Sequence, residues 1–315
     1  MKTVEDIIAR IRPRRKIKGI AAALLPFRND GTIAIDAFQS HLRETSEAGL
    51  TNAVNMDTGY VNLLTESEQI QVLECTREAI RPGEPFVAGA YIEKLEGDVV
   101  SLYRRKVDQI EAMGGIAIIF QSTRLHHLSW REIVSIYQAI CKGHHHVLAF
   151  ELGGMFADSG QIFDDDTVRG LMDIPELVGL KHSSLDRLTE LKRLRLRDEL
   201  RPEFTIYSGN DLGIDMVEYG SDYLLGLATF TPAKFATRDR LWEAGDPSYY
   251  SLSSALQHLG EIAFRSPISA YKHSAACFLY VTGKIPSPLP HPNSCTRRVW
   301  EIELMRECAE RLHLL

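Results

Sequence analysis

One lysine, Lys181, stands at the end of an apolar run, in the stretch LVGLKHSS from Leu177 to Ser184. A charged side chain is costly in such surroundings unless it is paired or has a chemical task. A free lysine, with a pKa of about 10.4, is protonated at neutral pH and is no nucleophile. Desolvation favours the neutral amine, which can attack a carbonyl group and form a Schiff base. The alternative is a lysine whose amine extends to solvent at the strand end.

Eight short apolar runs, separated by segments of helical periodicity, are expected to position this lysine. Runs that are apolar on both faces suit parallel strands covered by helices. Eight such repeats favour an α/β fold, a (β/α)8 TIM barrel, over the alternative of an open doubly wound sheet. The predicted strands are 19–25, 52–56, 85–91, 116–120, 146–152, 177–181, 204–209 and 222–227.

In such a barrel Lys181 ends the sixth strand, at the C-terminal mouth where active sites are built. Because strand residues alternate between faces, Lys181 and Ser183 are expected on one side and His182 against the helix layer. From about Pro232 strand signals stop and helical patterns continue to the last residue. The sequence therefore predicts a barrel domain, 1–235, followed by a C-terminal helical extension, 236–315.

The composition limits the classes of partner. A formal net charge of -6 over 315 residues opposes general attraction to nucleic acid, and no run approaches the length of a membrane span. Five cysteines, odd in number and without metal-ligand spacing, indicate reduced thiols and a cytoplasmic protein. The N-terminal stretch has acidic and arginine residues within its short apolar pattern, so no secretory signal is expected.

Two histidine groups raise the alternative of a metal-dependent barrel hydrolase or aldolase. They are HHH, His144 to His146, and LHH, Leu125 to His127. Adjacent histidines point in different directions, and no partner at helical i+4 spacing accompanies them. We therefore expect surface turns and no metal, and Schiff-base chemistry itself requires no cofactor.

Five stretches of the chain match the motifs of a known family. They are ALLPFRNDGTIAID (23–36), DTG (57–59), LLTESEQ (63–69), GLKHSS (179–184) and YSGNDLGIDMVEYGSDYLLGL (207–227). Through them nearly the whole barrel, from about Gly19 to Pro232, resembles the dihydrodipicolinate synthase and N-acetylneuraminate lyase superfamily of class I aldolases. In that family the lysine of a G-[IL]-K motif carries the Schiff base, so the resemblance implies this role for Lys181. It also implies a homotetramer built as a dimer of dimers.

The chain departs from the family after the second strand. The family has a G-T-T-G-E motif there, which helps to hold the substrate's carboxylate. This chain reads MDTGY, so only Thr58 and Gly59 match. Asp57 would repel a carboxylate unless it is protonated or paired. The resemblance nevertheless implies that Asp57, Thr58 and Gly59 bind substrate.

A second departure concerns the proton relay. The family's fifth strand usually ends in Y-N-x-P, whose tyrosine transfers protons, whereas this chain has Phe150 in AFELGG. A phenyl ring cannot transfer a proton, so Phe150 is expected only to contact substrate. The tyrosines common after strand four are replaced by FQSTR, 120–124.

Tyr60 and Glu151 are the candidates for the missing acid–base work, because both lie beside predicted strand ends. The alternative for each is a hydrogen-bonded structural residue. Gly209 and Asn210, after strand seven, partly match the family's S-G-D-D loop and are predicted to contact substrate, with helix capping as the alternative for Asn210.

The sequence thus predicts a Schiff-base-forming lyase of aldolase, synthase or dehydratase type. Its substrate is expected to be a small 2-keto acid or sugar-acid derivative, with pyruvate among the candidates. Cleavage, condensation and dehydration share one iminium, so the sequence does not separate them. The alternative is a non-catalytic barrel that binds a sugar-like or keto-acid metabolite, having lost the relay tyrosine.

Overall fold

The computed structural model describes residues 3–315, and its eight strands form one closed barrel in chain order, β1 to β8. Every strand predicted from the sequence is present, so the predicted (β/α)8 barrel is confirmed. The observed strands are β1 Gly19–Ala22, β2 Thr51–Val54, β3 Phe86–Ala90, β4 Gly115–Ile119, β5 Val147–Leu152, β6 Leu177–Ser183, β7 Thr205–Ser208 and β8 Asp222–Leu225.

The chain divides into two compact units. One comprises Pro85–Leu224 together with the N-terminal residues up to Arg12, and the other comprises Pro13–Glu84 with Leu225–Leu315. The sequence-based boundary at residue 235 falls inside helix α8, Pro232–Ala244. The division into a barrel domain and a helical extension stays a prediction.

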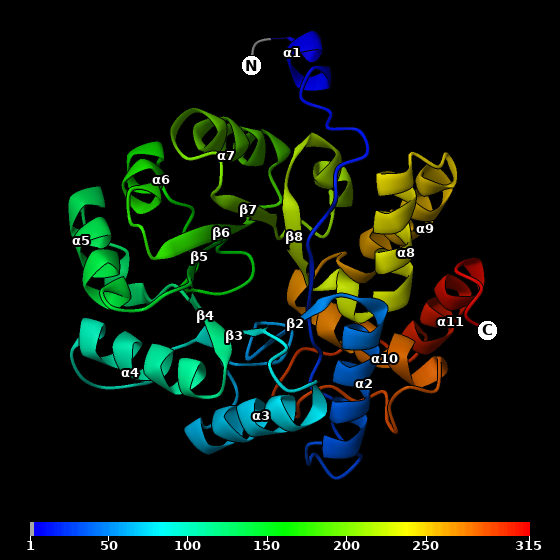
Figure 1. Ribbon diagram of the computed structural model, residues 1–315. Coiled ribbons are helices and arrows are strands. Elements are labelled where there is room, and N and C mark those ends of the chain that lie inside the picture. Colours follow the sequence, from blue (N-terminus) through cyan, green and yellow to red (C-terminus); the bar gives the residue numbers. More distant parts are fainter. Residues whose placement is uncertain (1–2) are drawn as a thin grey trace. The chain divides into compact units, whose positions relative to one another are not determined.

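In the first unit, helices cover the strands from outside (Figure 1). Neighbouring strands from β3 to β8 pair in parallel, and the register of β5 with β6 sets Phe150 opposite Lys181 and Glu151 opposite His182. The helices are α1 Val4–Ile8, α4 Val99–Ala112, α5 Trp130–Cys141, α6 Asp165–Met172 and α7 Arg187–Leu200, with 3₁₀ turns η1 Thr123–Leu125 and η2 Ile214–Tyr219.

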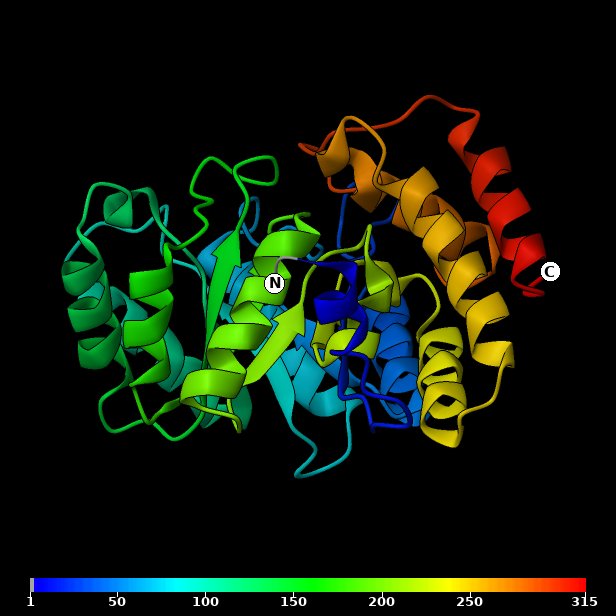
Figure 2. The same cartoon turned by 90° about the horizontal axis from the view of Figure 1, so that it is seen from above.

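In the second unit, β1 pairs in parallel with β2, α8 packs against α9, and α10 packs against α11 (Figure 2). The predicted C-terminal run of helices is therefore confirmed. The helices are α2 Ile35–Ala48, α3 Glu66–Ala79, α8, α9 Ser248–Ala263, α10 Tyr271–Val281 and α11 Glu301–Arg311, with 3₁₀ turns η3 Leu227–Thr229 and η4 Ile268–Ala270.

Local sequence signals explain where several helices begin. Thr65 and Ser129 each accept a hydrogen bond from the backbone amide three residues on, and the glutamate at that position accepts one from the backbone amide of the cap residue. Helix α2 ends at Gly49, which adopts the left-handed conformation that glycine tolerates best. No helix among residues 3–315 combines the length and apolar composition needed to cross a bilayer.

Candidate active site

Lys181 lies near the end of β6 and is only 7% exposed. Its amine lies 4.4 Å from the centroid of the Phe150 ring, which β5 presents from the neighbouring strand. The face of an aromatic ring attracts a cation. This attraction applies to a protonated amine and to a protonated imine, while a phenyl ring has no proton to give. The Phe150 ring thus attracts the cationic forms of Lys181 but supplies no acid.

The backbone after β7 lies against the stem of Lys181. The Gly209 amide donates to the His182 carbonyl at 2.7 Å. A Cβ atom at Gly209 would lie 2.9 Å from Lys181 Cε and 1.9 Å from Ser183 Oγ, so only glycine allows this close approach. Asn210 is buried, and its side-chain oxygen accepts from the Leu212 amide at 3.1 Å. This bond closes a turn, and the predicted substrate contact of Asn210 stays a prediction.

The opposite face of the same strand pair carries buried charge. Glu151 Oε1 and His182 Nδ1 lie 2.5 Å apart, and both side chains are fully buried. The other ring nitrogen of His182 lies 2.6 Å from the Ser184 hydroxyl. His182 therefore lies opposite Lys181, on the side facing the helices, as the alternation of strand residues predicted.

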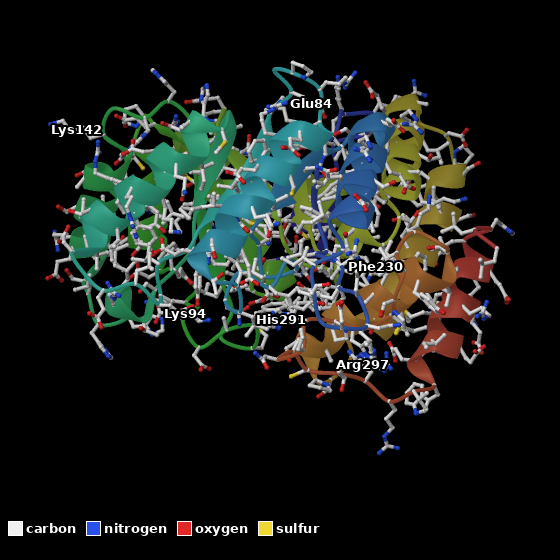
Figure 3. The ribbon with its side chains drawn as sticks, turned by 90° about the horizontal axis from the view of Figure 1, so that it is seen from below. Glu84, Lys94, Lys142, Phe230, His291 and Arg297 are labelled. Atoms are coloured by element: carbon white, nitrogen blue, oxygen red, sulfur yellow. The ribbon has the colours of Figure 1, made fainter. Side chains whose placement is uncertain are left out.

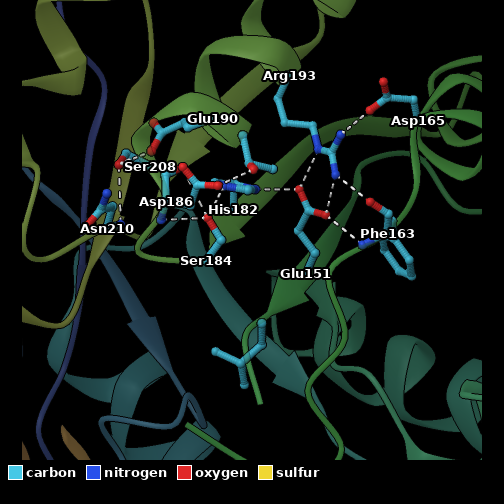
Figure 4. Close-up of polar contacts among 12 residues, drawn as sticks. Glu151, Phe163, Asp165, His182, Ser184, Asp186, Glu190, Arg193, Ser208 and Asn210 are labelled. Atoms are coloured by element: carbon cyan, nitrogen blue, oxygen red, sulfur yellow. Dashed lines mark hydrogen bonds and ion pairs between the residues drawn. The ribbon is translucent and has the colours of Figure 1, made fainter. Parts of the chain in front are cut away.

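Arg193 of α7 completes this cluster (Figure 4). Its guanidinium donates to both oxygens of Glu151, at 2.9 and 3.1 Å, and to Asp165 at 2.8 Å. It also donates to the Phe163 carbonyl at 2.5 Å, while the Phe163 amide donates to Glu151 at 3.0 Å. The acceptor capacity of the Glu151 carboxylate is thus used by groups of the protein itself. This arrangement favours a structural role for Glu151, and its predicted acid–base role stays a prediction.

Glu151 of β5 and His182 of β6 change each other's pKa in opposite directions. Burial by itself would raise the pKa of Glu151, but the charge and hydrogen bond of His182, with those of Arg193, outweigh burial and hold that pKa below its usual value. Burial would lower the pKa of His182, yet the adjacent Glu151 carboxylate raises it above its ordinary value. Each member of the pair thus favours the charged form of the other.

In the second unit, Tyr60 follows β2 and has a left-handed backbone, with φ of 59°. Its side chain is fully buried, and its ring meets Phe27 edge-on at 5.6 Å. Burial raises the pKa of the Tyr60 phenol, despite a backbone hydrogen bond from His291. A buried phenol that ionises less readily is a poor relay at neutral pH. The acid–base role of Tyr60 stays a prediction that its burial disfavours.

Asp57 is paired rather than isolated. Its carboxylate accepts from the Lys272 amine and from the Tyr271 hydroxyl, each at 2.9 Å. The Tyr271 hydroxyl also lies 2.9 Å from Thr58 Oγ1. Lys272 thus balances the charge that, unpaired, would repel a substrate carboxylate. The Gly59 amide donates to the Met56 carbonyl at 3.0 Å, which closes the turn that presents these side chains.

Sequence reasoning missed two of these residues. Arg193 lies among the buried positions of α7 between Leu191 and Leu194, and a charge within an apolar stripe was an available signal. Tyr271 had no comparable signal, because its partner Asp57 is 214 residues away in the chain.

Within the described part of the chain, Asp108, Glu111 and His144 form a group whose ligand atoms lie within 4.8 Å of one another. His144 Nδ1 already lies 2.8 Å from a Glu111 oxygen, which pairs a buried histidine with a partly exposed carboxylate. The group is on the helix layer around α4, and it contains neither Lys181 nor any predicted site residue. Nothing in this arrangement requires a metal.

The chain is similar to proteins of known sequence and of known structure. A 4-hydroxy-tetrahydrodipicolinate synthase of Kosmotoga olearia is 24% identical over 199 residues, a match that spans 62% of this chain and 64% of that protein. The crystal structure of dihydrodipicolinate synthase from Thermotoga maritima superimposes with a TM-score of 0.82 at 18% identity, covering 96% of this chain and 100% of that one. The Acinetobacter baumannii dihydrodipicolinate synthase, solved with pyruvate, gives 0.80 at 18% identity, covering 96% and 100%.

These structural likenesses, at such low identity, establish the fold. The family is established separately, because the sequence model of the dihydrodipicolinate synthetase family matches residues 16–270, most of the chain. The chain therefore belongs to the dihydrodipicolinate synthetase family.

Proposed function

We propose that this protein is a Schiff-base-forming lyase of the aldolase type, which acts on a small 2-keto acid through Lys181. The observation that carries the proposal is a buried lysine at the end of β6, with its amine beside an aromatic ring. The pyruvate bound to the Acinetobacter baumannii relative supports a 2-keto acid as the substrate class.

The proposed first step uses the neutral Lys181 amine, which attacks the C2 carbonyl carbon of the keto acid. The carbonyl oxygen takes up protons and leaves as water, and the nitrogen becomes a protonated imine. This iminium withdraws electrons from the neighbouring bond, which then breaks or forms. The Phe150 ring face attracts the iminium charge, so the same contact supports the covalent intermediate.

Proton transfer must come from groups other than Phe150. The predicted candidates Glu151 and Tyr60 stay proposals, although the first is held by Arg193 and the second is buried. Within the second unit, the Tyr271 phenol is hydrogen-bonded to Thr58 and Asp57. We keep Asp57, Thr58 and Gly59 as proposed substrate contacts.

Borohydride trapping tests the proposal. We expect protein incubated with pyruvate and borohydride to gain the mass of one reduced pyruvate adduct, located by peptide mass spectrometry on Lys181. Lys181→Arg keeps a positive charge but cannot form an imine, so it should give no adduct. The matched control is Lys106→Arg, which changes another buried lysine, on α4, and should leave trapping unchanged.

The second candidate function is a barrel that binds a keto-acid or sugar-like metabolite without catalysis. The phenyl ring of Phe150 in place of a relay tyrosine favours it. Absence of an adduct with pyruvate and with a panel of keto-sugar acids, together with calorimetric binding of one of them, would establish this function instead. The homotetramer and the cytoplasmic location also remain proposals, and light scattering measures the first directly.

A further inference from the structure

Ser184 ends the GLKHSS stretch and lies against the buried cluster on the helix-facing side of β6 (Figure 4). Because residues in extended chain alternate between faces, Ser184 follows His182 on that side. Its hydroxyl oxygen lies 2.6 Å from His182 Nε2, and His182 Nδ1 lies 2.5 Å from Glu151 Oε1. A hydroxyl, an imidazole and a carboxylate joined in this order form the arrangement that activates a serine as a nucleophile.

Glu151 fixes which nitrogen of His182 carries the proton. Arg193 donates to both Glu151 oxygens, and an ionised carboxylate can only accept hydrogen bonds. His182 Nδ1 must therefore donate to Glu151, which leaves Nε2 of the neutral ring as an acceptor facing Ser184. Burial would lower the pKa of His182, but the Glu151 carboxylate raises it, which makes Nε2 a better base. A proton that leaves the Ser184 hydroxyl thus has a base to receive it.

The remaining contacts of Ser184 leave its oxygen able to attack. The Asp186 amide donates to Oγ at 2.9 Å, which fills one of the two acceptor positions of the oxygen. The hydroxyl proton has two acceptors within reach, His182 Nε2 at 2.6 Å and the Asp186 carbonyl at 3.3 Å, and the shorter contact is the stronger. The Ser184 side chain is half-buried, so a small reagent can reach it from solvent.

The turn from β6 into α7 carries backbone strain beside this serine. Leu185 has a left-handed backbone, with φ of 58°, a conformation that costs energy for a residue with a branched side chain. Strained residues of this kind are concentrated at functional sites. The Asp186 amide already closes the turn onto Ser184, so the turn does not need the contact between Ser184 and His182.

We propose that Ser184 is a nucleophilic modification site, which takes an acyl or phosphoryl group from an uncharged donor. Ser184 Oγ bonds to the donor's carbonyl carbon or phosphorus, its proton passes to His182 Nε2, and the leaving group departs with the electron pair of the broken bond. Because the His182 ring is fully buried, it cannot pass this proton on to the leaving group, so the donor needs a leaving group that is stable as an anion. The Asp186 carboxylate, at the start of α7, opposes an anionic donor. The proposal goes beyond Schiff-base chemistry and does not depend on it, since Lys181 lies on the other face of β6.

Diisopropyl fluorophosphate is the probe, because it is uncharged and releases fluoride. The full-length protein is incubated with it, and peptide mass spectrometry follows the rate of modification at each site. We expect Ser184 to react at least about 10²-fold faster than Ser129, since a general base contributes about 10²–10⁴-fold. Ser129 is the matched control, because it is more exposed but donates to a carboxylate, Glu132, at 2.6 Å. The exposed amines of Lys94 and Lys142 report non-specific reaction (Figure 3). Modification of Ser184 no faster than of Ser129 overturns the proposal.

His182→Gln tests the base. Glutamine keeps hydrogen-bonding groups at this position but accepts no proton, so modification of Ser184 should slow by about 10²-fold while that of Ser129 stays the same. An unchanged rate at Ser184 in a variant with the circular dichroism spectrum of the wild type contradicts the proposal.

The pH profile of the wild type decides the question if His182→Gln does not fold. The rate at Ser184 should rise as His182 loses its proton and then level off, because the neutral imidazole is the reactive form. A hydroxyl without a base reacts as its alkoxide, so a rate that keeps rising with pH overturns the proposal. The charged groups that face His182 are Glu151 of β5 with Asp186, Glu190 and Arg193 of α7 and its cap. Glu190→Gln should move the plateau to lower pH without removing it, because Glu190 helps to raise the pKa of His182. Loss of the plateau in that variant would assign the transition to Glu190 and overturn the role of His182.

Discussion

The Phe150 ring limits which reaction steps can be assisted beside the Lys181 amine. An aromatic face within about 6 Å of a cation contributes roughly 0.5–2 kcal/mol, and here the separation is 4.4 Å. That contact stabilises the ammonium as well as the iminium, so it opposes the first step and supports the next. What the ring cannot do is move the proton that a pyruvate imine must lose from its methyl carbon.

Phe150→Tyr should therefore restore a proton relay beside the amine. General acid–base catalysis contributes about 10²–10⁴-fold in rate, and we expect about tenfold from a phenol that has no evolved partners. The measurement is deuterium incorporation into the methyl group of pyruvate, followed by NMR. The Lys181→Arg/Phe150→Tyr double variant should show no exchange, which ties the effect to the imine. A single variant no faster than wild type contradicts this account of Phe150.

Gly209→Ala should displace Lys181, because the new Cβ would lie 2.9 Å from Lys181 Cε and 1.9 Å from Ser183 Oγ. We expect borohydride trapping of pyruvate to slow by at least about tenfold, since small misplacements of a reacting group are costly. Gly154→Ala is the matched control, because the nearest atom to its added Cβ is the Gly160 carbonyl oxygen at 4.0 Å. Equal trapping rates in the two variants would show that the contact at Gly209 does not position the lysine.

Among the elements, β5 and β6 act as a pair with two different faces. One face sets Phe150 against Lys181, and the other sets Glu151 against His182, in the same register. A slip of one residue would exchange the faces and bury Lys181 among the helices. The Glu151–His182–Arg193 cluster therefore holds the register that keeps Lys181 on the opposite face.

Arg193→Met should show how much the Glu151–His182–Arg193 cluster contributes to the free energy of unfolding. Removing one partner of a buried ion pair leaves an uncompensated charge, at a cost of about 3–5 kcal/mol in the free energy of unfolding. Arg195→Met is the control, because Arg195 lies on the same helix with 45% of its side chain exposed, beside Glu199. That change should stay within about 0.5 kcal/mol. Urea unfolding measures the stability of both variants. Equal losses of stability in the two would show that the buried cluster makes no special contribution.

At the scale of the whole molecule, the sequence predicted most of the architecture because its local signals agree with the fold. Each strand is a short apolar run with clear ends in the sequence, and helices such as α3 and α5 carry their own capping boxes. The place of Lys181 near the end of a strand was predictable for the same reason, since its charge interrupts an apolar run. The closed barrel then follows from eight repeats of one pattern.

The rest of the candidate site depends on pairings that no local pattern encodes. Arg193 and Glu151 are 42 residues apart, and the sequence does not show that an arginine on α7 fills the acceptors of a strand glutamate. Tyr60 lies at a left-handed backbone position that carries its ring into buried aromatic contacts. The sequence indicated that Asp57 needs a partner. It did not identify Lys272 as that partner, because the two residues are far apart in the chain.

The buried cluster should also shape how the stability of the whole molecule depends on pH. The pKa of His182 is raised in the folded state, so its contribution is complete below the unfolded value of about 6.5. That contribution is lost as pH rises through the folded pKa. The pKa of Glu151 is lowered, so its contribution is complete above about 4.3 and is lost as pH falls through its folded pKa.

The free energy of unfolding should therefore fall as pH rises above about 6.5, with a slope from His182 of at most about 1.4 kcal/mol per pH unit. Glu190 adds a decline that starts lower, because burial raises its pKa. His182→Gln retains Glu190, so the difference in slope between wild type and this variant isolates the imidazole. Urea unfolding at several pH values gives both slopes. Parallel curves would mean that His182 is neutral in the fold and contributes to the Glu151 cluster only as a hydrogen-bond partner.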